Sequence, residues 1–382
     1  MKISEIMLSA SSKGKRLVRS TVHDLPECAR ATLCSSKVVV GYTKKHPIYT
    51  DVFGSHPPPG FTYAPHPSIA ATSRFLAEAA WSRAQIIHLD AASGLRIVGD
   101  CPVVVECEGV PAPEFFADPR VRQILVESRW AGRNHLDHPK VSLLRPATPL
   151  RSSYPPKLNR GPVHVLAVGH GGMVKGFDAV FALYRELSRK QPVKLTIAGS
   201  LGHNFETYPE IRRDAPGFHA LDELQSWVNS RKDPKLVLQP YRRSTLLRRI
   251  YPSADIYLHL GRMETFGFSV LEAMSYGLPV VATAINAIPE MVRHGENGYL
   301  IDSPLDINSP DWTASVAGQA RRYVELLATS PALRQEMGWR ALARVRTRFS
   351  IAYRQAYLSC TYSRILRGIV SSAGKDSGSG VW

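Results

Sequence analysis

The sequence predicts an α/β protein built from two Rossmann-like domains, each with a doubly wound parallel sheet. In the second half, short apolar runs alternate with helical patterns, and strands that alternate with helices form parallel sheets with right-handed crossovers. The length of 382 residues suits two domains of ordinary size better than one core. A proline-rich segment, residues 146–162, lies between the two halves and is expected to be the linker.

The second half contains the more regular pattern. Several of its apolar runs are closed by glycine or proline, as is typical of buried parallel strands. The expected strands are 163–168, 194–198, 235–238, 255–260, 279–282 and 299–301, and the expected helices are 177–188, 244–251, 269–276 and 351–366.

The first half is less regular but is also expected to be α/β, with long loops. Strands are predicted over 37–41, 85–89, 103–106 and 123–126, and the segments 56–60 and 63–67 are proline-rich. The expected division is an N-terminal domain over 1–150, a C-terminal domain over 161–345, a helix within 346–370 and a flexible Ser- and Gly-rich tail over 371–382.

The chain is strongly basic. Lysine and arginine number 48 against 32 aspartates and glutamates, which gives a formal net charge of +16. Such a charge indicates nucleic acid, an anionic membrane surface or an anionic substrate as a partner, or only a solvated basic surface. Because no RNA-binding signature and no helix-turn-helix or zinc-finger spacing is present, nucleic-acid binding would rest on charge alone and is not expected.

Neither a membrane span nor a metal site is expected. No apolar run reaches the roughly 18–20 residues that cross a bilayer, and residues 1–10 lack the pattern of a signal peptide. We therefore expect a cytoplasmic protein, at most peripheral on the inner face of the membrane. Five cysteines stand at spacings that match no zinc site, so reduced thiols are expected.

The segment from Gly261 to Gly277 carries two carboxylates on either side of a turn. Gly267 lets a ligand approach the backbone, and the amides that begin the following helix form an anion site. Glu272 lies about one turn inside that helix, where a carboxylate can accept hydrogen bonds from a ribose. Glu264 lies before the turn and can face a second polyol such as a sugar. This arrangement suits a sugar nucleotide, and two surface acids beside a tight turn are the alternative.

A second glycine-rich loop runs from Val168 to Gly176. Its glycines permit close approach of the backbone to phosphate, and Lys175 supplies a point charge for a diphosphate. A P-loop would need Ser or Thr after the lysine, but Gly176 follows it. A dinucleotide site expects an acid at the end of the next strand, which here ends at Gly199.

No Asp-x-Asp motif occurs in the sequence. Because metal-dependent sugar transfer usually needs clustered carboxylates, Lys175 and the helix terminus are expected to neutralise the diphosphate without a metal ion. Hydrolase motifs of the Gly-x-Ser-x-Gly and His-Glu-x-x-His types are also absent.

The stretch from Glu264 to Leu300 resembles the signature of glycosyltransferase family 4, the retaining transferases with the GT-B fold. That family carries Glu, seven residues, Glu, and then Ala-Met-x-x-Gly-x-Pro-Val-Val-Ala, and this chain has the second part at residues 272–282. Ile288-Pro-Glu290 and residues 295–300 also look like the family. The resemblance extends through most of 161–302 and is faint in 1–150.

The resemblance implies a nucleotide-sugar donor in a cleft between the two domains, bound mainly by the C-terminal one. Lys175 would contact the diphosphate and Glu272 the ribose. Glu264 and the backbone at Phe266, Gly267 and Phe268 would hold the transferred sugar and the distal phosphate. The family is usually metal-independent, transfers with retention of anomeric configuration, and has a last helix that crosses back to the first domain.

Three positions depart from the family pattern. In the donor loop, His170 stands where the family usually has arginine, and Gly171 follows it. A neutral imidazole would neutralise less of the donor's charge than a guanidinium does. Asn286-Ala287 replaces a frequent Gly-Gly. In the first domain, Glu108 of Glu106-Cys-Glu-Gly109 stands where many members have a histidine that faces the sugar, so it could contact the donor sugar or the acceptor.

These observations predict a transferase that moves a hexose-type unit from a UDP- or GDP-linked sugar to a hydroxyl acceptor. Glu264, Lys175 and Glu108 are the expected catalytic residues, and no cofactor besides the donor is expected. The basic clusters suggest a glycan or lipid-linked acceptor of the cell-envelope type, at an anionic membrane surface. The alternatives are an epimerase or phosphorylase of the same fold, and a non-catalytic protein that binds nucleotide sugars.

Overall fold

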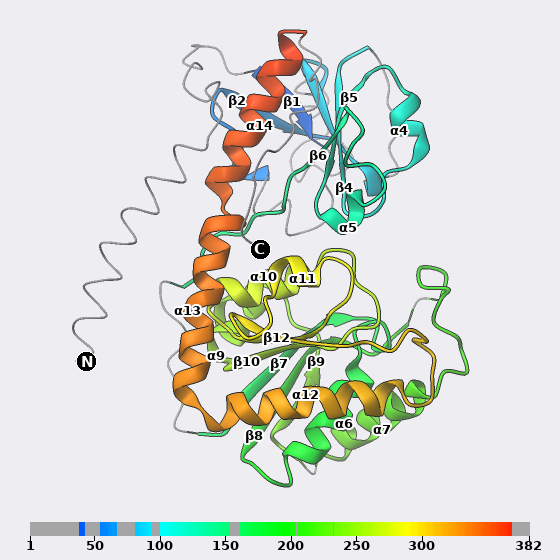
Figure 1. Cartoon of the computed structure of the whole chain (residues 1–382), viewed down its shortest axis with the longest axis vertical. Coiled ribbons are helices and arrows are strands. Elements are labelled where there is room, and N and C mark those ends of the chain that lie inside the picture. The colour runs from blue at the N-terminus through cyan, green and yellow to red at the C-terminus, as the bar shows by residue number, and fades with distance from the viewer. Residues whose placement is uncertain are drawn as a thin grey trace, which may run out of the picture. The chain divides into compact units, whose positions relative to one another are not determined.

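The computed structural model describes residues 38–42, 54–66, 81–93, 100–152, 161–203, 205–231 and 233–368 (Figure 1). Residues 1–10, residues 153–160 of the expected linker and the expected tail lie outside these ranges. The described residues fall into two compact units. The first unit takes its residues from 38–127, 132–147 and 347–368, and the second unit from 128–131 and 148–346.

The first unit contains a parallel sheet with the strand order β2-β1-β3-β4-β5-β6. The chain reverses its direction of progress across the sheet between β1 and β3, as in flavodoxin-like doubly wound domains. The elements are β1 (Val38–Tyr42), β2 (Phe61–Pro65), β3 (Ile86–Asp90), η3 (Ala91–Ser93), β4 (Val103–Cys107), α4 (Pro113–Ala117), β5 (Val121–Val126), α5 (Arg129–Gly132) and β6 (Val141–Leu143).

Two strands of this sheet, β2 and β6, were not expected from the sequence. Both lie at its edges. β2 ends in Pro65, and proline is tolerated at an edge because no further ladder hydrogen bond is needed there. β6 has only three residues. Residues 63–67 were expected to be a proline-rich segment between strands. This is wrong for residues 63–65, which belong to β2.

The last helix, α14 (Ile351–Leu366), belongs to the first unit. The Ser350 side chain caps it by accepting a hydrogen bond from the amide of Tyr353. Leu358 and Tyr362 of α14 join a buried cluster that contains Val40 and Val104 of the sheet. The chain thus returns to its first unit after completing the second.

A buried polar cluster also connects α14 to this sheet. Glu106 lies in β4, where every residue is buried. Its Oε2 atom is 2.6 Å from Nη2 of Arg354 and 3.0 Å from Nε2 of His88, and all three side chains are at most 3% exposed. Nδ1 of His88 lies 2.5 Å from the Tyr362 hydroxyl. Burial alone would lower the pKa of Arg354, but the adjacent Glu106 raises it well above its usual value.

Three of the five cysteines lie in the described ranges. Cys101 and Cys107 are not disulfide-bonded. Cys360 of α14 is disulfide-bonded, so the expectation of reduced thiols is wrong for this residue.

The second unit contains a parallel sheet with the strand order β12-β11-β10-β7-β8-β9. Numbered along the chain, this is the 3-2-1-4-5-6 order of dinucleotide-binding domains. All six strands expected from the sequence are confirmed, and their ends move by no more than two residues. They are β7 (Val163–His170), β8 (Val193–Ser200), β9 (Leu236–Gln239), β10 (Ile256–His259), β11 (Val280–Thr283) and β12 (Gly298–Ile301).

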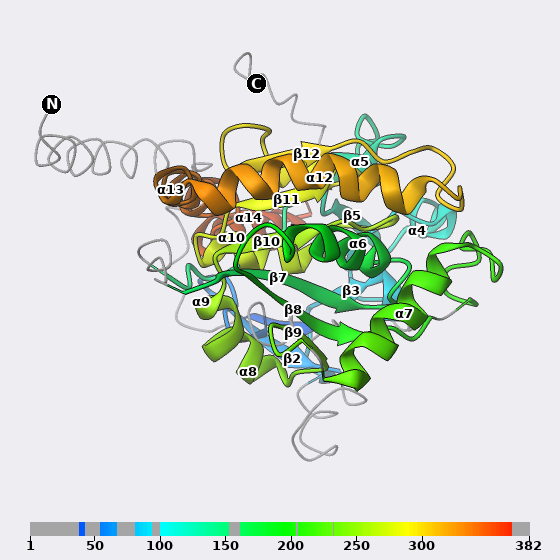
Figure 2. The same cartoon turned by 90° about the horizontal axis from the view of Figure 1, so that it is seen from below.

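Helices cover both faces of this sheet. Figures 1 and 2 show α6, α7 and α12 on one side, with α6 beside α12, and α10 and α11 on the other. None of the helices in the described part of the chain is long and apolar enough to span a membrane. The helices are α6 (Phe177–Leu187), α7 (Gly217–Ser230), α8 (Arg243–Thr245), η4 (Leu246–Ile250), α9 (Tyr251–Ser253), α10 (Phe268–Ser275), α11 (Ile288–Met291), α12 (Trp312–Thr329) and α13 (Pro331–Arg348).

We predict that Arg354→Ala lowers the free energy of unfolding by about 3–5 kcal/mol, because it leaves the buried Glu106 carboxylate without its main counter-charge. Arg367→Ala, at an exposed position just beyond α14, should change it by about 0.5 kcal/mol or less. Urea unfolding of the two variants tests this expectation, and similar values for both would contradict it.

Candidate functional site

The second unit reverses its strand order between β7 and β10, which pair in parallel with Leu166 opposite Tyr257. In open α/β sheets, ligands bind at the carboxyl ends of the strands at such a reversal. The loop 171–176 follows β7, and the loop 260–267 follows β10. The topology therefore brings the two sequence motifs of the second half to one place.

Lys175 and Glu264 form an ion pair at this reversal. The Lys175 ammonium donates a hydrogen bond of 2.7 Å to Oε2 of Glu264, and the side chains are 18% and 10% exposed. Nε2 of His259, the last residue of β10, lies 3.4 Å from the same oxygen. A cation and a carboxylate thus lie together at the carboxyl ends of the two central strands, with limited access to water.

The charges of this group follow from burial and from its neighbours. Burial tends to raise the pKa of Glu264, but Lys175, His259 and the Thr265 amide hold it below its ordinary value. Burial and, to a smaller extent, Lys175 lower the pKa of His259 to about 4, although Glu264 opposes this shift. At neutral pH the site therefore contains an ionised Glu264 and a neutral His259.

Gly169 makes room for the lysine. A Cβ atom at this position would lie 2.7 Å from Cγ of Lys175, so the aliphatic part of the lysine passes directly over the glycine. The Lys175 amide donates to the Gly171 carbonyl at 2.9 Å, which closes the loop. The glycine-rich loop thus fixes the direction of the lysine side chain, in addition to the role expected for it near phosphate.

His170 and Gly171 begin the same loop. His170 ends β7 and is exposed, and its Nδ1 atom lies 3.0 Å from the Ser200 hydroxyl at the end of β8. Gly171 follows with a φ of +84° and is buried. His170 therefore lies at the same carboxyl end of the strands as Lys175, with its imidazole accessible from solvent.

Gly267 precedes α10 with a φ of +95°, in the left-handed region that favours glycine. A Cβ atom there would lie 2.6 Å from Cδ1 of Ile288 in α11. The glycine is thus required by this close packing and by its φ, whereas the sequence interpretation gave ligand approach as the reason. Phe266 is fully buried and Phe268 half-buried, and their ring centroids are 5.2 Å apart.

Helix α10 begins at this turn without a side-chain cap. Glu272 lies just over one turn inside it, and its side chain is 4% exposed. Its Oε2 atom accepts a 3.1 Å hydrogen bond from the Tyr251 hydroxyl, and its Oε1 atom is 2.5 Å from Nη2 of Arg243. A carboxylate offers about four acceptor positions, so two of them are occupied by the protein.

Asn286 explains how one departure from the family pattern is accommodated. Its φ is +46°, and after glycine, asparagine is among the residues that best tolerate this region. Its side-chain amide donates a hydrogen bond to the carbonyl oxygen of Glu264. The asparagine therefore keeps a backbone conformation typical of glycine and adds a contact that holds the Glu264 loop.

Arg262 was not assigned a role from the sequence, although it lies within the quoted motif. It is 4% exposed, and its guanidinium forms two hydrogen bonds of 2.7 Å with the carboxylate of Asp178. It also donates to the carbonyl oxygens of Met173 at 3.0 Å and Ile307 at 2.9 Å, and lies 3.5 Å from the Trp312 ring centre.

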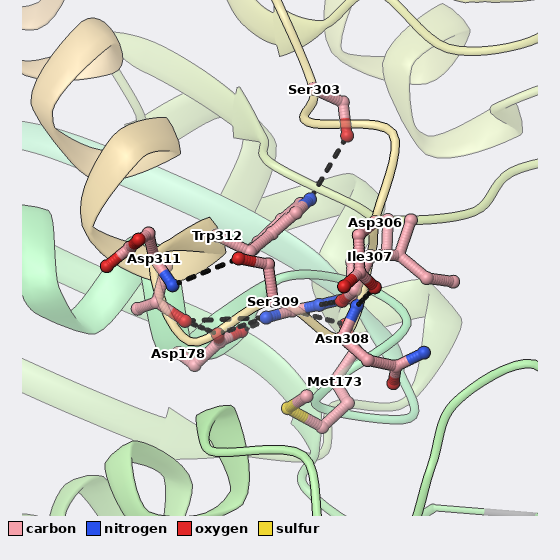
Figure 3. A network of polar contacts seen from close by, with 11 residues as sticks. Met173, Asp178, Ser303, Asp306, Ile307, Asn308, Ser309, Asp311 and Trp312 are labelled. Atoms are coloured by element: carbon pink, nitrogen blue, oxygen red, sulfur yellow. Dashed lines mark hydrogen bonds and ion pairs between the residues drawn. The ribbon is translucent and has the colours of Figure 1, made fainter.

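Figure 3 shows Met173, Asp178, Ile307 and Trp312 gathered in this network. The network connects the loop after β7, helix α6, the loop after β10 and the start of α12. His259 was also missed by sequence reasoning. A histidine that ends a fully buried strand was the available signal.

Glu108 lies in the first unit, directly after the carboxyl end of β4, and is half-buried. The other predicted site residues all lie in the second unit. Lys175 and Glu264 contact each other, while Glu272 is held separately by Tyr251 and Arg243. Within the described ranges, no group of three or more His, Cys, Asp or Glu side chains is placed to hold a metal ion.

Comparison with known proteins identifies the class to which this site belongs. Residues 153–311 match the family described as glycosyl transferases group 1. The chain is 28% identical over 275 residues to D-inositol 3-phosphate glycosyltransferase from Mycolicibacterium smegmatis, covering 71% of this chain and 56% of that protein. Across the first five curated relatives, the matched part spans between 22% and 56% of the relative's own length.

Solved structures show the same fold over most of the chain. Sucrose-phosphate synthase from Thermosynechococcus elongatus gives a TM-score of 0.61 at 16% identity, covering 87% of this chain and all of that one. HepE from Anabaena in complex with UDP-glucose gives 0.58 at 12% identity, covering 85% and 99%. Two Rossmann-like units of the GT-B class are thus confirmed, and residues 153–311 match the group 1 glycosyltransferase family, which agrees with the family 4 resemblance.

We predict that the free energy of unfolding decreases as the pH falls from about 6.5 towards 4, because the unfolded chain protonates His259 more readily than the folded protein does. Between pH 7.5 and 5, this histidine should account for about 2 kcal/mol. Urea unfolding at both values, with wild type and His259→Gln, measures the difference. An equally large pH effect in the variant would argue against this assignment.

We predict that Asn286→Ala is less stable than Asn286→Gly by about 1 kcal/mol, since both lose the amide contact with Glu264 but only alanine is strained at a positive φ. Urea unfolding of the pair checks this expectation. Equal stabilities would show that the left-handed backbone conformation is not what this position requires.

Proposed function

We propose that the protein transfers a sugar from a nucleoside diphosphate sugar to a hydroxyl acceptor. The observation that carries the proposal is the Lys175–Glu264 ion pair at the reversal point of the second sheet, beside the uncapped start of α10. The match to the group 1 glycosyltransferase family supports the same activity. A donor with a uracil or guanine base suits the proposal, and UDP-glucose is the ligand named for the HepE structure.

The diphosphate of the donor would bind Lys175 and the amide groups at the start of α10. Both supply positive charge where the leaving diphosphate gains negative charge as the glycosidic bond breaks. His170 and Gly171 lie at the same carboxyl end of the strands and complete the proposed phosphate side of the site.

The ion pair gives Glu264 a defined role in this scheme. When a diphosphate draws the lysine, one oxygen of Glu264 becomes available to accept hydrogen bonds from hydroxyls of the sugar. Glu272 would hold the ribose through the acceptor positions that Tyr251 and Arg243 leave unused. Glu108 of the first unit is the proposed contact for the donor sugar or the acceptor.

The stereochemistry and the absence of a metal requirement are also proposed, on the family 4 resemblance. The acceptor would attack on the face that the diphosphate leaves, so the anomeric configuration is retained. Lys175 and the α10 amides would neutralise the diphosphate in place of a cation. Turnover should therefore persist in EDTA, and the product anomer can be assigned by NMR.

The proposed acceptor is a glycan or glycolipid of the cell-envelope type, reached at an anionic membrane surface. The support is the net charge of +16, which favours anionic partners. Co-sedimentation with acidic vesicles at low salt tests this part, and failure to bind would remove the membrane surface while leaving the sugar transfer intact.

We predict that one family of nucleoside diphosphate sugars raises the melting temperature, since a ligand that binds only the native state stabilises it. Lys175→Ala should abolish the shift and reduce kcat/KM by about 10²–10³-fold through the loss of charge stabilisation. Lys190→Ala, exposed just after α6, is the matched control and should keep both. A thermal-shift screen and a donor-turnover assay give the two measurements.

Glu264→Ala separates the roles within the site. It should retain binding of the free nucleoside diphosphate and lose sugar turnover, and unchanged turnover would refute the assignment. Donor binding without turnover in the wild type would instead indicate a non-catalytic nucleotide-sugar-binding protein. A requirement for free phosphate would indicate a phosphorylase.

A further inference from the structure

A pocket of about 410 Å³ opens in the first unit, at the amino ends of β4, β5 and β6 and beside the carboxyl end of α14. Ligand pockets in proteins commonly have volumes of about 300–1,000 Å³, so it is large enough for a small organic molecule. Its charged and amide side chains are Asp100, Arg120, Arg122, Gln123, Lys140 and Arg364.

Four of these side chains are cationic and one is acidic. Arg120 is paired with Asp118 through contacts of 3.0 Å and 2.7 Å. Arg122 and Arg364 have no side-chain partner among the described residues. Asp118 offsets the charge of Arg120. The remaining cations, Arg122, Lys140 and Arg364, outnumber the single acid Asp100 by two charges. This excess is larger than the roughly half negative charge at the carboxyl end of α14. The pocket is therefore positive.

The third of these cations, Lys140, is held in place. Its ammonium donates to the carbonyl oxygens of Phe116 at 2.9 Å and Asp118 at 3.0 Å. Its own carbonyl accepts a 2.7 Å hydrogen bond from the amide of Gln123, which is 3% exposed. This part of the wall is thus preorganised, and Arg122 and Arg364 complete it with guanidinium groups whose donors are available.

The pocket is separate from the proposed transfer chemistry of the first unit. Pro102, in its wall, immediately precedes β4, and Glu108 immediately follows that strand. At about 3.3 Å per residue, the strand separates them by about 20 Å. The inference therefore does not depend on the proposed function.

We propose that this pocket binds a phosphate-bearing small molecule through Arg122 and Arg364, with Lys140 on the adjacent wall. Guanidinium groups match the tetrahedral oxygens of a phosphate with paired hydrogen bonds, which makes arginine well suited to this task. The volume exceeds that of a phosphate group alone, so an organic phosphate fits it better than the inorganic ion. The phosphate can belong to a soluble metabolite or to a lipid headgroup.

Isothermal titration of the full chain with sn-glycerol 3-phosphate at low salt tests the proposal, with glycerol and inorganic phosphate as comparison ligands. The double variant Arg122→Gln/Arg364→Gln should bind glycerol 3-phosphate at least about tenfold more weakly. The matched control is Arg133→Gln/Arg367→Gln, which removes the same charge at exposed positions of the first unit outside the pocket. Arg122→Lys/Arg364→Lys should retain part of the affinity.

Two further arms complete the experiment. Lys175→Ala should bind glycerol 3-phosphate as wild type does, which separates this pocket from the proposed donor site. Flotation with phosphatidylcholine vesicles, with and without phosphatidic acid, shows whether the phosphate comes from a lipid. The proposal is overturned if no probe binds, if the control pair weakens binding as much as the pocket pair, or if Lys175→Ala removes it. Circular dichroism confirms that each variant is folded.

Discussion

The buried ion pair between Arg262 and Asp178 is the interaction on which the candidate site depends. Arg262, in the loop after β10, donates hydrogen bonds to Asp178, Met173 and Ile307. These three residues lie in different segments, so each bond connects another segment to this loop. Because both charges are almost fully buried, neither can be lost without leaving the other uncompensated. The two loops that carry Lys175 and Glu264 therefore have a fixed relative position before any ligand arrives.

Much of the fold could be predicted from sequence, for a physical reason that also explains the errors. Strands such as β10 and β11 are buried on both faces, so they are continuous apolar runs that sequence patterns reveal. The edge strands β2 and β6 lack that signature. Helices α7, α12 and α13 were also missed.

The candidate site, like the fold, could be predicted from the sequence only in part. Lys175 and Glu264 could be singled out because they lie in recognisable motifs, and topology then brought them together. The partnership of Arg262 with Asp178 joins positions 84 residues apart, and neither motif contains both. Asn286 looked like a departure from the family pattern, whereas its left-handed backbone conformation preserves what a glycine would supply. Side-chain pairing and backbone conformation are three-dimensional properties, which residue spacing does not encode.

The long sequence distance between Glu106 and Arg354 has a consequence for biosynthesis. The two residues are 248 positions apart, and at about 5–20 residues per second a ribosome needs about 12–50 s between them. Throughout that interval the sheet of the first unit lacks the helix that covers Val40 and Val104 and neutralises its buried carboxylate. The second unit, made almost entirely from one continuous stretch, can finish folding sooner. The first unit, whose sheet is synthesised before the second unit, is thus completed after it, and its apolar sheet face needs protection from aggregation until α14 emerges.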